Sequence, residues 1–162
     1  MTWSLRPATA DDLERLAELR AVVMRPDLER LGRYDEHRVR QRLRDAYAPE
    51  HTRIIEVAGD FAGSVTLRPA DRLWLEHFYL APQYQGRGIG SGVLRSVLDR
   101  DDDVWLNVLQ GSPARKLYER HGFVLDSEDP VDVFMVRRRI PGPSQSADPG
   151  ALPLSAVRDA RL

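Results

Sequence analysis

The sequence predicts a single α/β (α+β) domain whose strands and helices follow one another in the order βααβββαβαββ. Three observations favour this class. A strand-prone run at residues 73–80 breaks at a proline into a glycine-rich turn that opens a helix. The buried-strand pattern of residues 104–109 is followed by an amphipathic helix that a glycine closes. Two strand-like runs within residues 53–67 are joined by a Gly-Asp turn signal, which is typical of a hairpin.

The first part of the chain predicts one strand and two helices. The strand covers residues 3–6, and the segment 9–12 forms a capping-box-like start for the first helix. The apolar positions of this helix share one face: Leu13, Leu16, Ala17 and Leu19. We expect a broken, charged stretch around residues 25–27, and then a second helix at 36–47.

The remaining elements alternate along the chain. We expect strands at 53–58 and 61–67, joined at Gly59-Asp60, a strand at 73–80, a helix at 88–100, a strand at 104–109, a helix at 113–121, and strands at 123–126 and 131–138. The acidic run 101–103 is interpreted as a solvated turn, and we expect no metal. Prolines and small residues accumulate near the C-terminus, so a domain at 1–140 is expected to be followed by a Pro-rich flexible tail at 141–162.

Composition limits the classes of function. The chain has 162 residues, of which 42% are hydrophobic, and this suits one domain with a useful core. The formal net charge is -1, so no global field attracts nucleic acid or an anionic membrane, and we expect neither partner. The lack of cysteine excludes disulfides, thiolate metal sites and a cysteine nucleophile. No apolar run approaches the ~18 residues of a membrane span and no signal-peptide core is present, so we expect a cytoplasmic protein.

The glycine-rich turn at residues 85–90, Q-G-R-G-I-G, predicts a cradle for a pyrophosphate. Glycines let backbone N–H groups approach an anion closely, and the first turn of the next helix adds unpaired N–H groups and the positive end of its dipole. Arg87 adds a fixed positive fork. The glycine spacing differs from G-x-G-x-x-G, and no G-x-x-x-x-G-K-[ST] is present, so dinucleotide and nucleoside triphosphate sites are not indicated.

A second segment, residues 112–123, reads S-P-A-R-K-L-Y-E-R-H-G-F and predicts a helix capped by Ser112 with Pro113 in its first turn. Together, the two segments resemble motifs A and B of the GNAT superfamily of N-acetyltransferases, Q/R-x-x-G-x-G/A and N-x-A-x-x-L-Y-x-x-x-G-F. The first motif is complete, whereas in the second Ser112 stands where family members usually carry Asn. The resemblance covers about residues 3–139.

The resemblance implies a central twisted sheet, mixed but mostly antiparallel, flanked by helices. It implies acetyl-CoA as the acyl-donor cosubstrate. Strand 73–80 would splay from strand 104–109 around a bulge near residues 79–82, and its exposed backbone would pair with the pantetheine arm. The residues that the resemblance assigns to coenzyme A are Phe78, Tyr79, Leu80, Gln85, Gly86, Arg87, Gly88, Ile89, Gly90, Ser91, Asn107, Ser112, Ala114 and Tyr118. Among these, the Leu80 N–H would face the thioester carbonyl.

Three side chains are the candidates for catalysis. Glu76, which strict alternation places on one strand face with Trp74 and Phe78, is the leading acceptor of the amine proton, and its alternative role is a structural partner of an arginine. His77 falls on the opposite face by the same alternation, although a bulge could turn it inward. Tyr118 matches the family tyrosine that donates a proton to the departing thiolate, and its alternative role is packing in the core. With no cysteine to carry the acyl group, transfer would be direct.

The acceptor is less well defined. In the family, specificity comes largely from the region between the first two helices, here residues 23–44 with seven arginines: Arg25, Arg30, Arg33, Arg38, Arg40, Arg42 and Arg44. These favour an acidic acceptor, but solvated helix faces with ion pairs are the preferred interpretation. We therefore expect transfer to a primary amine of a small molecule or of a protein or peptide. The alternative is a non-catalytic acyl-CoA-binding or sensory module. Nucleic-acid binding through residues 137–139 is disfavoured, and a homodimer is left open.

Overall fold

A computed structural model describes residues 2–139 of the chain, and these form one seven-stranded sheet in the order β1-β2-β3-β4-β5-β7-β6. The strands are β1 (Trp3–Pro7), β2 (Thr52–Val57), β3 (Asp60–Pro69), β4 (Leu73–Leu80), β5 (Val104–Leu109), β6 (Val124–Glu128) and β7 (Asp132–Arg137). The helices are α1 (Leu13–Arg30), α2 (Glu36–Ala46), α3 (Ile89–Val97) and α4 (Ala114–Arg120), with short 3₁₀ turns η1 (Ala10–Asp12), η2 (Pro49–His51) and η3 (Pro82–Tyr84). The element order is the predicted one.

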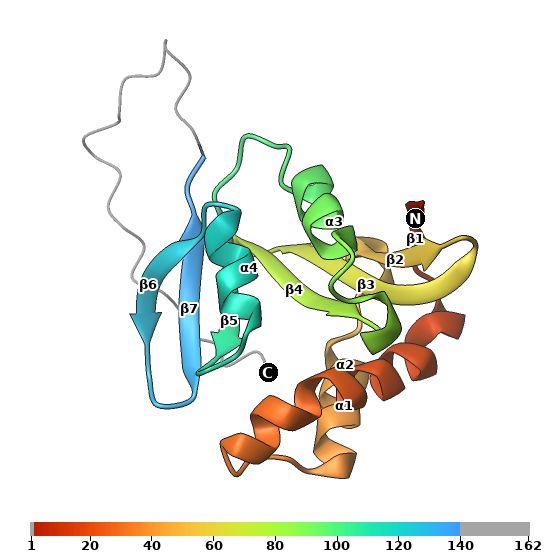
Figure 1. Cartoon of the computed structure of the whole chain (residues 1–162), viewed down its shortest axis with the longest axis horizontal. Helices are drawn as coiled ribbons and strands as arrows, with labels where there is room; N and C mark the ends of the chain where they lie inside the picture. The colour runs from red at the N-terminus through yellow and green to blue at the C-terminus, as the bar shows by residue number, and fades with distance from the viewer. Residues whose placement is uncertain (1, 140–162) are drawn as a thin grey trace.

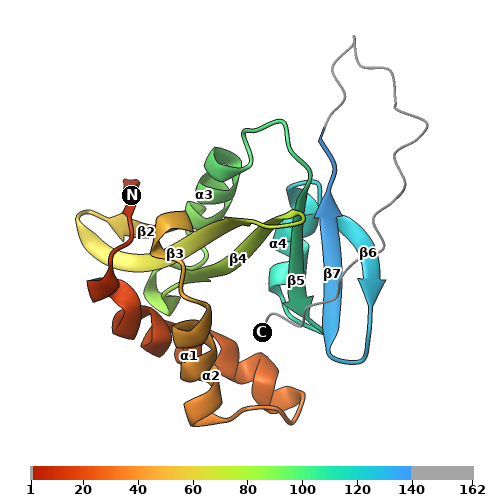
Figure 2. The ribbon, with the colours of Figure 1, turned by 180° about the vertical axis from the view of Figure 1, so that it is seen from behind.

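Helices cover both faces of the sheet (Figure 1). Helices α3 and α4 lie on one face, and α1 and α2 lie on the other, as the view from behind also shows (Figure 2). The larger apolar core joins the sheet to α3 and α4, and a smaller one joins it to α1 and α2. Among the strands of residues 2–139, only β4 and β5 pair in parallel, and all other neighbours are antiparallel. The prediction of a mixed, mostly antiparallel sheet flanked by helices is confirmed.

The first helix begins at the predicted cap. Thr9 and Asp12 form a capping box, in which the Thr9 N–H donates to the Asp12 carboxylate at 2.9 Å. Arg6 of β1 also donates to both oxygens of this carboxylate, at 2.9 and 2.8 Å. The start of the helix is therefore tied to the sheet as well as capped.

The expected break at residues 25–27 was wrong, because α1 continues through Pro26 to Arg30. Proline cannot donate to the carbonyl four residues earlier, which here is that of Val22, a residue that is 55% exposed. Leu28 is buried beyond the proline, so the last turn gains packing that offsets the lost hydrogen bond. Tertiary packing outweighs the local signal.

The hairpin between β2 and β3 turns one residue earlier than expected. Val57 pairs with Asp60, so the turn residues are Ala58 and Gly59 and not Gly59-Asp60. Both turn residues have positive φ, 51° and 84°, as a two-residue type I′ turn requires. Ala58 is one of only two non-glycine residues with positive φ in the described chain, and the other is His77 in β4.

Other boundaries lie close to the expectation, apart from α3, which ends at Val97 and not near Arg100. In the acidic run that follows, Asp102 pairs with Arg100 and Asp103 pairs with Arg138. Within residues 2–139, no helix has both the length and the apolarity that a bilayer span requires. The predicted tail at 141–162 lies outside the described residues.

Candidate active site

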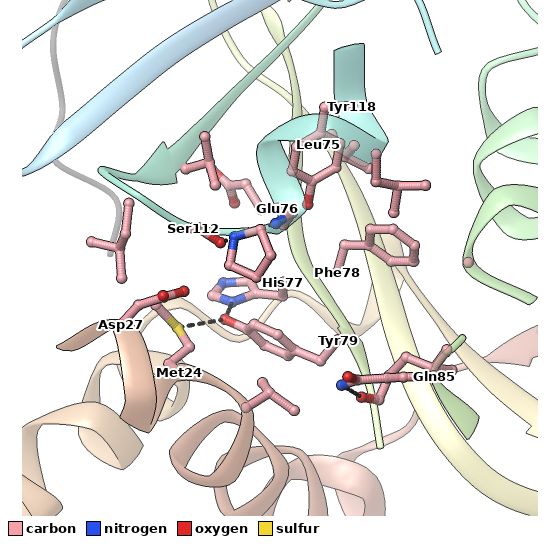
Figure 3. Close-up of a pocket in the computed structure, with 18 of the residues that line it drawn as sticks. Met24, Asp27, Leu75, Glu76, His77, Phe78, Tyr79, Gln85, Ser112 and Tyr118 are labelled. Atoms are coloured by element: carbon pink, nitrogen blue, oxygen red, sulfur yellow. Dashed lines mark hydrogen bonds between the residues drawn. The ribbon is translucent and has the colours of Figure 1, made fainter. Parts of the chain in front are cut away.

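The candidate site lies where the sheet opens between its two parallel strands. β4 and β5 pair only at Leu73–Val104 and Trp74–Trp105, and beyond these two pairs the strands diverge. The gap contains a cavity of about 640 Å³. Its walls come from four places: the diverging half of β4, the start of α3, the region of β5 and α4, and one side of α1 (Figure 3). The cavity therefore touches elements from both faces of the sheet.

A bulge in β4 shapes one wall of this cavity. Ser64 pairs with Tyr79 and Thr66 pairs with Glu76. One residue of β3 lies between the two pairs, whereas β4 has two residues there, His77 and Phe78. His77 takes the left-handed conformation with φ 45°, and the Ser64 hydroxyl donates to its carbonyl oxygen at 2.7 Å. A bulge was expected near residues 79–82, and it lies earlier because the extra residue is His77.

The bulge reverses the predicted faces of β4 beyond Glu76. Phe78 packs with Leu80 against the core under α3 and α4, so the prediction that it shares a face with Glu76 was wrong. The His77 ring turns towards Tyr79 on the α1 side, with Nδ1 3.1 Å from the tyrosine hydroxyl, so the alternation-based prediction for His77 also fails. The inserted residue changes the side-chain alternation, and His77 lines the cavity.

The backbone of Leu80 is turned into the gap. The Ala81 N–H donates to the Ala62 carbonyl at 2.8 Å, which makes these two residues a hydrogen-bonded pair. Antiparallel pairing alternates, so the neighbouring pair, Gly63 and Leu80, directs its N–H and C=O groups away from each other. The Leu80 carbonyl accepts from the Gln85 side chain at 2.8 Å. The Leu80 N–H is thus directed to the side of β4 where β5 has diverged.

The glycine-rich turn has the shape of an anion cradle. Gly86 and Gly88 have φ of 72° and 79°, and a Cβ added at either would meet nothing within 4 Å. Gly88 is the N-cap of α3, whose first N–H groups have no intrahelical acceptor. Ile89 anchors the helix in the core at 2% exposure. Arg87 is exposed and lies outside the set of residues that line the cavity.

On the opposite wall, α4 presents Tyr118. The side chain is buried, packs against Phe78 and Phe123, and lines the cavity. No hydrogen bond to its hydroxyl is made by the residues that the structure describes. Burial raises the pKa of Tyr118 well above its usual range, so the hydroxyl is protonated at neutral pH.

Ser112 and Asn107, also assigned to coenzyme A from the sequence, line the cavity but bond within the protein. The Ser112 hydroxyl accepts from the Ala114 N–H at 3.2 Å, but α4 begins at Ala114, one residue later than predicted, so its N-cap is Pro113 and not Ser112. Asn107 donates to the Asp132 carboxylate at 3.1 Å. Their side chains therefore stabilise the wall of the cavity.

Glu76 is held by an arginine. Arg68 of β3 donates to both carboxylate oxygens, at 3.1 and 2.9 Å, and the glutamate side chain is largely buried. Burial raises the pKa of Glu76, and the Arg68 guanidinium opposes this rise.

A hydrogen-bonded chain extends from His77 into α1. Tyr79 links the two, because its hydroxyl accepts from Arg20 Nε at 3.0 Å and lies beside His77 Nδ1 and Met24 Sδ (Figure 3). Burial and then the positive charges of Arg20 and Arg68 lower the pKa of His77 to about 4, so its ring is neutral at neutral pH. The neutral ring can accept a proton on one nitrogen and donate from the other.

The α1 wall contains Arg20, Val23, Met24 and Asp27. The last three belong to the region 23–44 that the resemblance assigns to acceptor specificity, whereas Arg20 was not selected from the sequence. A signal for Arg20 was present. Arg20 follows Leu16 by four residues, so it interrupts the apolar stripe of the helix. Within residues 2–139, no three His, Cys, Asp or Glu side chains gather in a way that could hold a metal ion.

Comparison with known proteins places these features in a family context. Residues 13–123 match the family model of the acetyltransferase (GNAT) family. A comparison with curated proteins gives no significant match.

Solved structures share the fold at low sequence identity. PaiA N-acetyltransferase from Thermoplasma acidophilum, in complex with coenzyme A, has a TM-score of 0.68 and 21% identity, with 85% of this chain and 99% of that chain covered. Arabidopsis thaliana Naa50, in complex with the bisubstrate analogue CoA-Ac-MVNAL, has a TM-score of 0.62 and 22% identity over 84% and 97%. N-acetylglutamate synthase from Neisseria gonorrhoeae has a TM-score of 0.61 and 22% identity over 87% of this chain and 36% of its own.

Proposed function

Because the chain belongs to the GNAT family of acetyltransferases, we propose that it transfers an acetyl group from acetyl-CoA directly to a primary amine. One observation carries the proposal. A single cavity joins the glycine cradle, the outward edge of β4 and the Tyr118 side chain, so the groups that would hold the donor also face the place where it would react.

The cradle and the strand edge would bind the donor. The N–H groups at the start of α3 suit a diphosphate, because the first turn of a helix gives them no intrahelical acceptor and they lie at the positive end of the helix dipole. The diverging half of β4 offers backbone groups with which an extended pantetheine arm could pair as a further strand would. Arg87, exposed beside the cradle, supplies positive charge for the same anion.

Acetyl transfer would then take place in the gap between β4 and β5. The amine nitrogen attacks the thioester carbonyl carbon, and the Leu80 N–H stabilises the negative charge that develops on the carbonyl oxygen. As the intermediate collapses, the carbon–sulfur bond breaks and the Tyr118 hydroxyl gives its proton to the sulfur. The amine must lose a proton for attack, and we assign its acceptance to Glu76, whose burial favours proton uptake.

His77 is the competing acceptor of that proton. It lines the same cavity and is neutral, but its lowered pKa makes it a weak base. Glu76 is preferred because a carboxylate with a raised pKa is better matched to accept a proton near neutral pH. Variants at the two positions separate these roles.

The nature of the acceptor has support of two kinds. The structural neighbours include a complex with a peptide-like bisubstrate analogue and a synthase of N-acetylglutamate, so proteins of this fold act on peptides and on amino acids. Both acceptor types are amines, which supports N-acetylation as the reaction proposed for this chain.

Turnover with a panel of amines tests the proposal. The full chain is incubated with acetyl-CoA and one amine at a time, and free thiol is measured against a sample without acceptor. We expect amine-dependent thiol release with formation of the acetylated amine, detected by mass. Stabilisation of the protein by coenzyme A without turnover on any amine would instead favour the alternative, a non-catalytic acyl-CoA-binding module.

A further inference from the structure

Arg20 is a buried cation in the wall of the cavity. It lies on α1, is only 2% exposed, and ranks among the largest fully buried side chains of the described chain. It lines the cavity on the α1 side, across the gap from the helices that would hold the donor. A buried arginine is costly unless its charge is compensated, so its position needs an explanation.

The contacts of Arg20 leave its charge without an acidic partner. Nε donates to the Tyr79 hydroxyl at 3.0 Å, and Nη1 donates to the Val39 carbonyl at 2.5 Å. Both acceptors are neutral, and no residue in the described part of the chain accepts from Nη2. Within residues 2–139, no carboxylate lies within ion-pair distance of this guanidinium.

The surface arginines of the same two helices differ in this respect. Arg40 pairs with Glu18 at 2.8 Å, and Arg44 pairs with Glu14 at 2.9 Å. These guanidinium groups are more exposed than Arg20, yet each has a carboxylate. The exposed arginines therefore have carboxylate partners, although a surface ion pair contributes little to stability, whereas the buried Arg20 has none among the described residues.

A second arginine, Arg42, lies near enough to Arg20 to be affected by its charge. Burial, followed by the charges of Arg20 and Arg38, lowers the pKa of Arg42. Asp27, the acidic residue that α1 contributes to the cavity wall, is paired with Arg30 at 2.6 Å. A negatively charged group that entered the cavity beside Arg20 would therefore meet attraction from a partly desolvated cation.

We propose that Arg20 binds a carboxylate of the acceptor, so that the amine acetylated by this protein is an amino acid or a related small amino carboxylate. The assignment rests on the proposed function, since it names the acceptor of that reaction. Arg20 reaches the bulge of β4 through Tyr79, so the bound carboxylate lies on the α1 side and the amine extends towards the gap. A guanidinium also suits this task because its planar fork matches a carboxylate.

Arg20 also connects α1 to β4 and α2, so loss of activity in a variant would not separate binding from a structural role. Discrimination between ligands does separate them. The ligands are N-acetyl amino acids, each paired with its carboxamide and its phosphonate analogue, and their binding is measured by calorimetry in the presence of coenzyme A. A purely structural arginine would not distinguish the members of a pair.

The full chain is compared with Arg20→Gln and Arg20→Lys, and with Arg40→Gln as the matched control on the neighbouring helix. The wild-type protein should bind the carboxylates about 10- to 100-fold more tightly than the carboxamides. Arg20→Gln should abolish this preference, Arg20→Lys should keep part of it, and Arg40→Gln should leave it intact. The wild-type comparison needs no variant, so it stands even if Arg20→Gln does not fold.

Equal binding of carboxylate and carboxamide by the wild-type protein would overturn the proposal, as would a preference that survives in Arg20→Gln. Tighter binding of the phosphonate would overturn the assignment to a carboxylate. The proposed acetyl transfer is scored separately by turnover. Carboxylate preference without turnover supports the Arg20 site and contradicts the transfer function. Turnover at the same rate with and without a carboxylate on the acceptor supports the transfer function and contradicts the Arg20 site.

Discussion

His77 sets the geometry of the candidate site, because it is the inserted residue of the β4 bulge. Its φ of 45° is a conformation that non-glycine residues seldom adopt, and the Ser64 hydroxyl fixes its carbonyl at 2.7 Å. Strict alternation along β4 could not predict this, since a bulge depends on the register of the partner strand. Strained backbone of this kind is often found at functional sites.

The lowered pKa of His77 predicts a pH-dependent stability. The ring has a pKa of about 4 in the folded protein and 6.5 as the ordinary value, so the unfolded chain binds a proton that the folded protein refuses. Stability is therefore lost as pH falls from about 6.5 towards 4, by up to roughly 3 kcal/mol. Asparagine tolerates positive φ, so His77→Asn should fold. Its free energy of unfolding, measured with urea, should fall less than that of the wild type between pH 7 and pH 5.

The control for this experiment is His37→Asn, which removes an exposed histidine outside the cavity. It should follow the wild-type pH dependence. If His77→Asn and the wild type lose the same free energy of unfolding on acidification, the histidine is not the group responsible.

Tyr118 is predicted to act late in the reaction. Tyr118→Phe removes the hydroxyl but keeps the ring that packs on Phe78 and Phe123, so the fold should persist. We expect kcat to fall about 10²- to 10⁴-fold with little change in coenzyme A affinity, because only the proton donated to the thiolate is lost. Steady-state kinetics and calorimetry measure the two quantities. A parallel loss of affinity would assign Tyr118 to binding.

Glu76 and His77 give different pH profiles. If Glu76 accepts the amine proton, kcat/KM should fall on acidification through a pKa above the usual carboxylate value, since burial raises it and only the ionised form accepts. Glu76→Gln should remove this limb. Should Glu76→Gln keep the wild-type profile while His77→Asn loses activity, the acceptor is His77.

Among the elements, β4 and β5 have the predicted bounds, 73–80 and 104–109, because both are apolar runs with clear breaks at their ends. The continuation of α1 through Pro26 was not predictable in the same way. It depends on the burial of Leu28 and on the exposure of Val22, which are properties of the packed helix and not of the local pattern. The faces of β4 beyond Glu76 were missed for a similar reason.

The close contact between β3 and β4 at the bulge predicts that any side chain at position 63 destabilises the fold. A Cβ on Gly63 would lie 2.0 Å from the Tyr79 carbonyl oxygen, which is backbone and cannot move without shifting β4. Gly63→Ala should therefore cost about 1–3 kcal/mol or more in urea unfolding. The matched control is Gly90→Ala, where the added Cβ would have ordinary contacts at 3.7 and 3.8 Å with Leu117 and Phe78. That variant should keep or slightly raise stability. Equal stability of the two variants would contradict the contact.

In the whole molecule, the site lies where the sheet opens between helices with different proposed roles. The donor side, with the cradle and Tyr118, belongs to α3 and α4, whereas the α1 side contributes Arg20 and faces Tyr79. The cradle and α4 could be predicted because each is a short contiguous motif. The contacts of Arg20 could not be predicted, since Tyr79 and Val39 reach it from distant parts of the sequence.

Coenzyme A should stabilise the whole domain through the cradle. At about 100 times its dissociation constant, a ligand that binds only the folded state adds roughly 2.7 kcal/mol, visible as a raised Tm. Gly88→Leu should abolish this shift, because its side chain would occupy the open space above the N-terminus of α3. The substitution also forces a left-handed conformation on leucine, at a cost of about 1–2 kcal/mol.

Gly32→Leu is the matched control, since Gly32 has φ 69°, equally open surroundings and a position outside the cavity. It should lose similar stability but keep the shift with coenzyme A. A shift with NAD and none with coenzyme A would show that the cradle binds a different diphosphate.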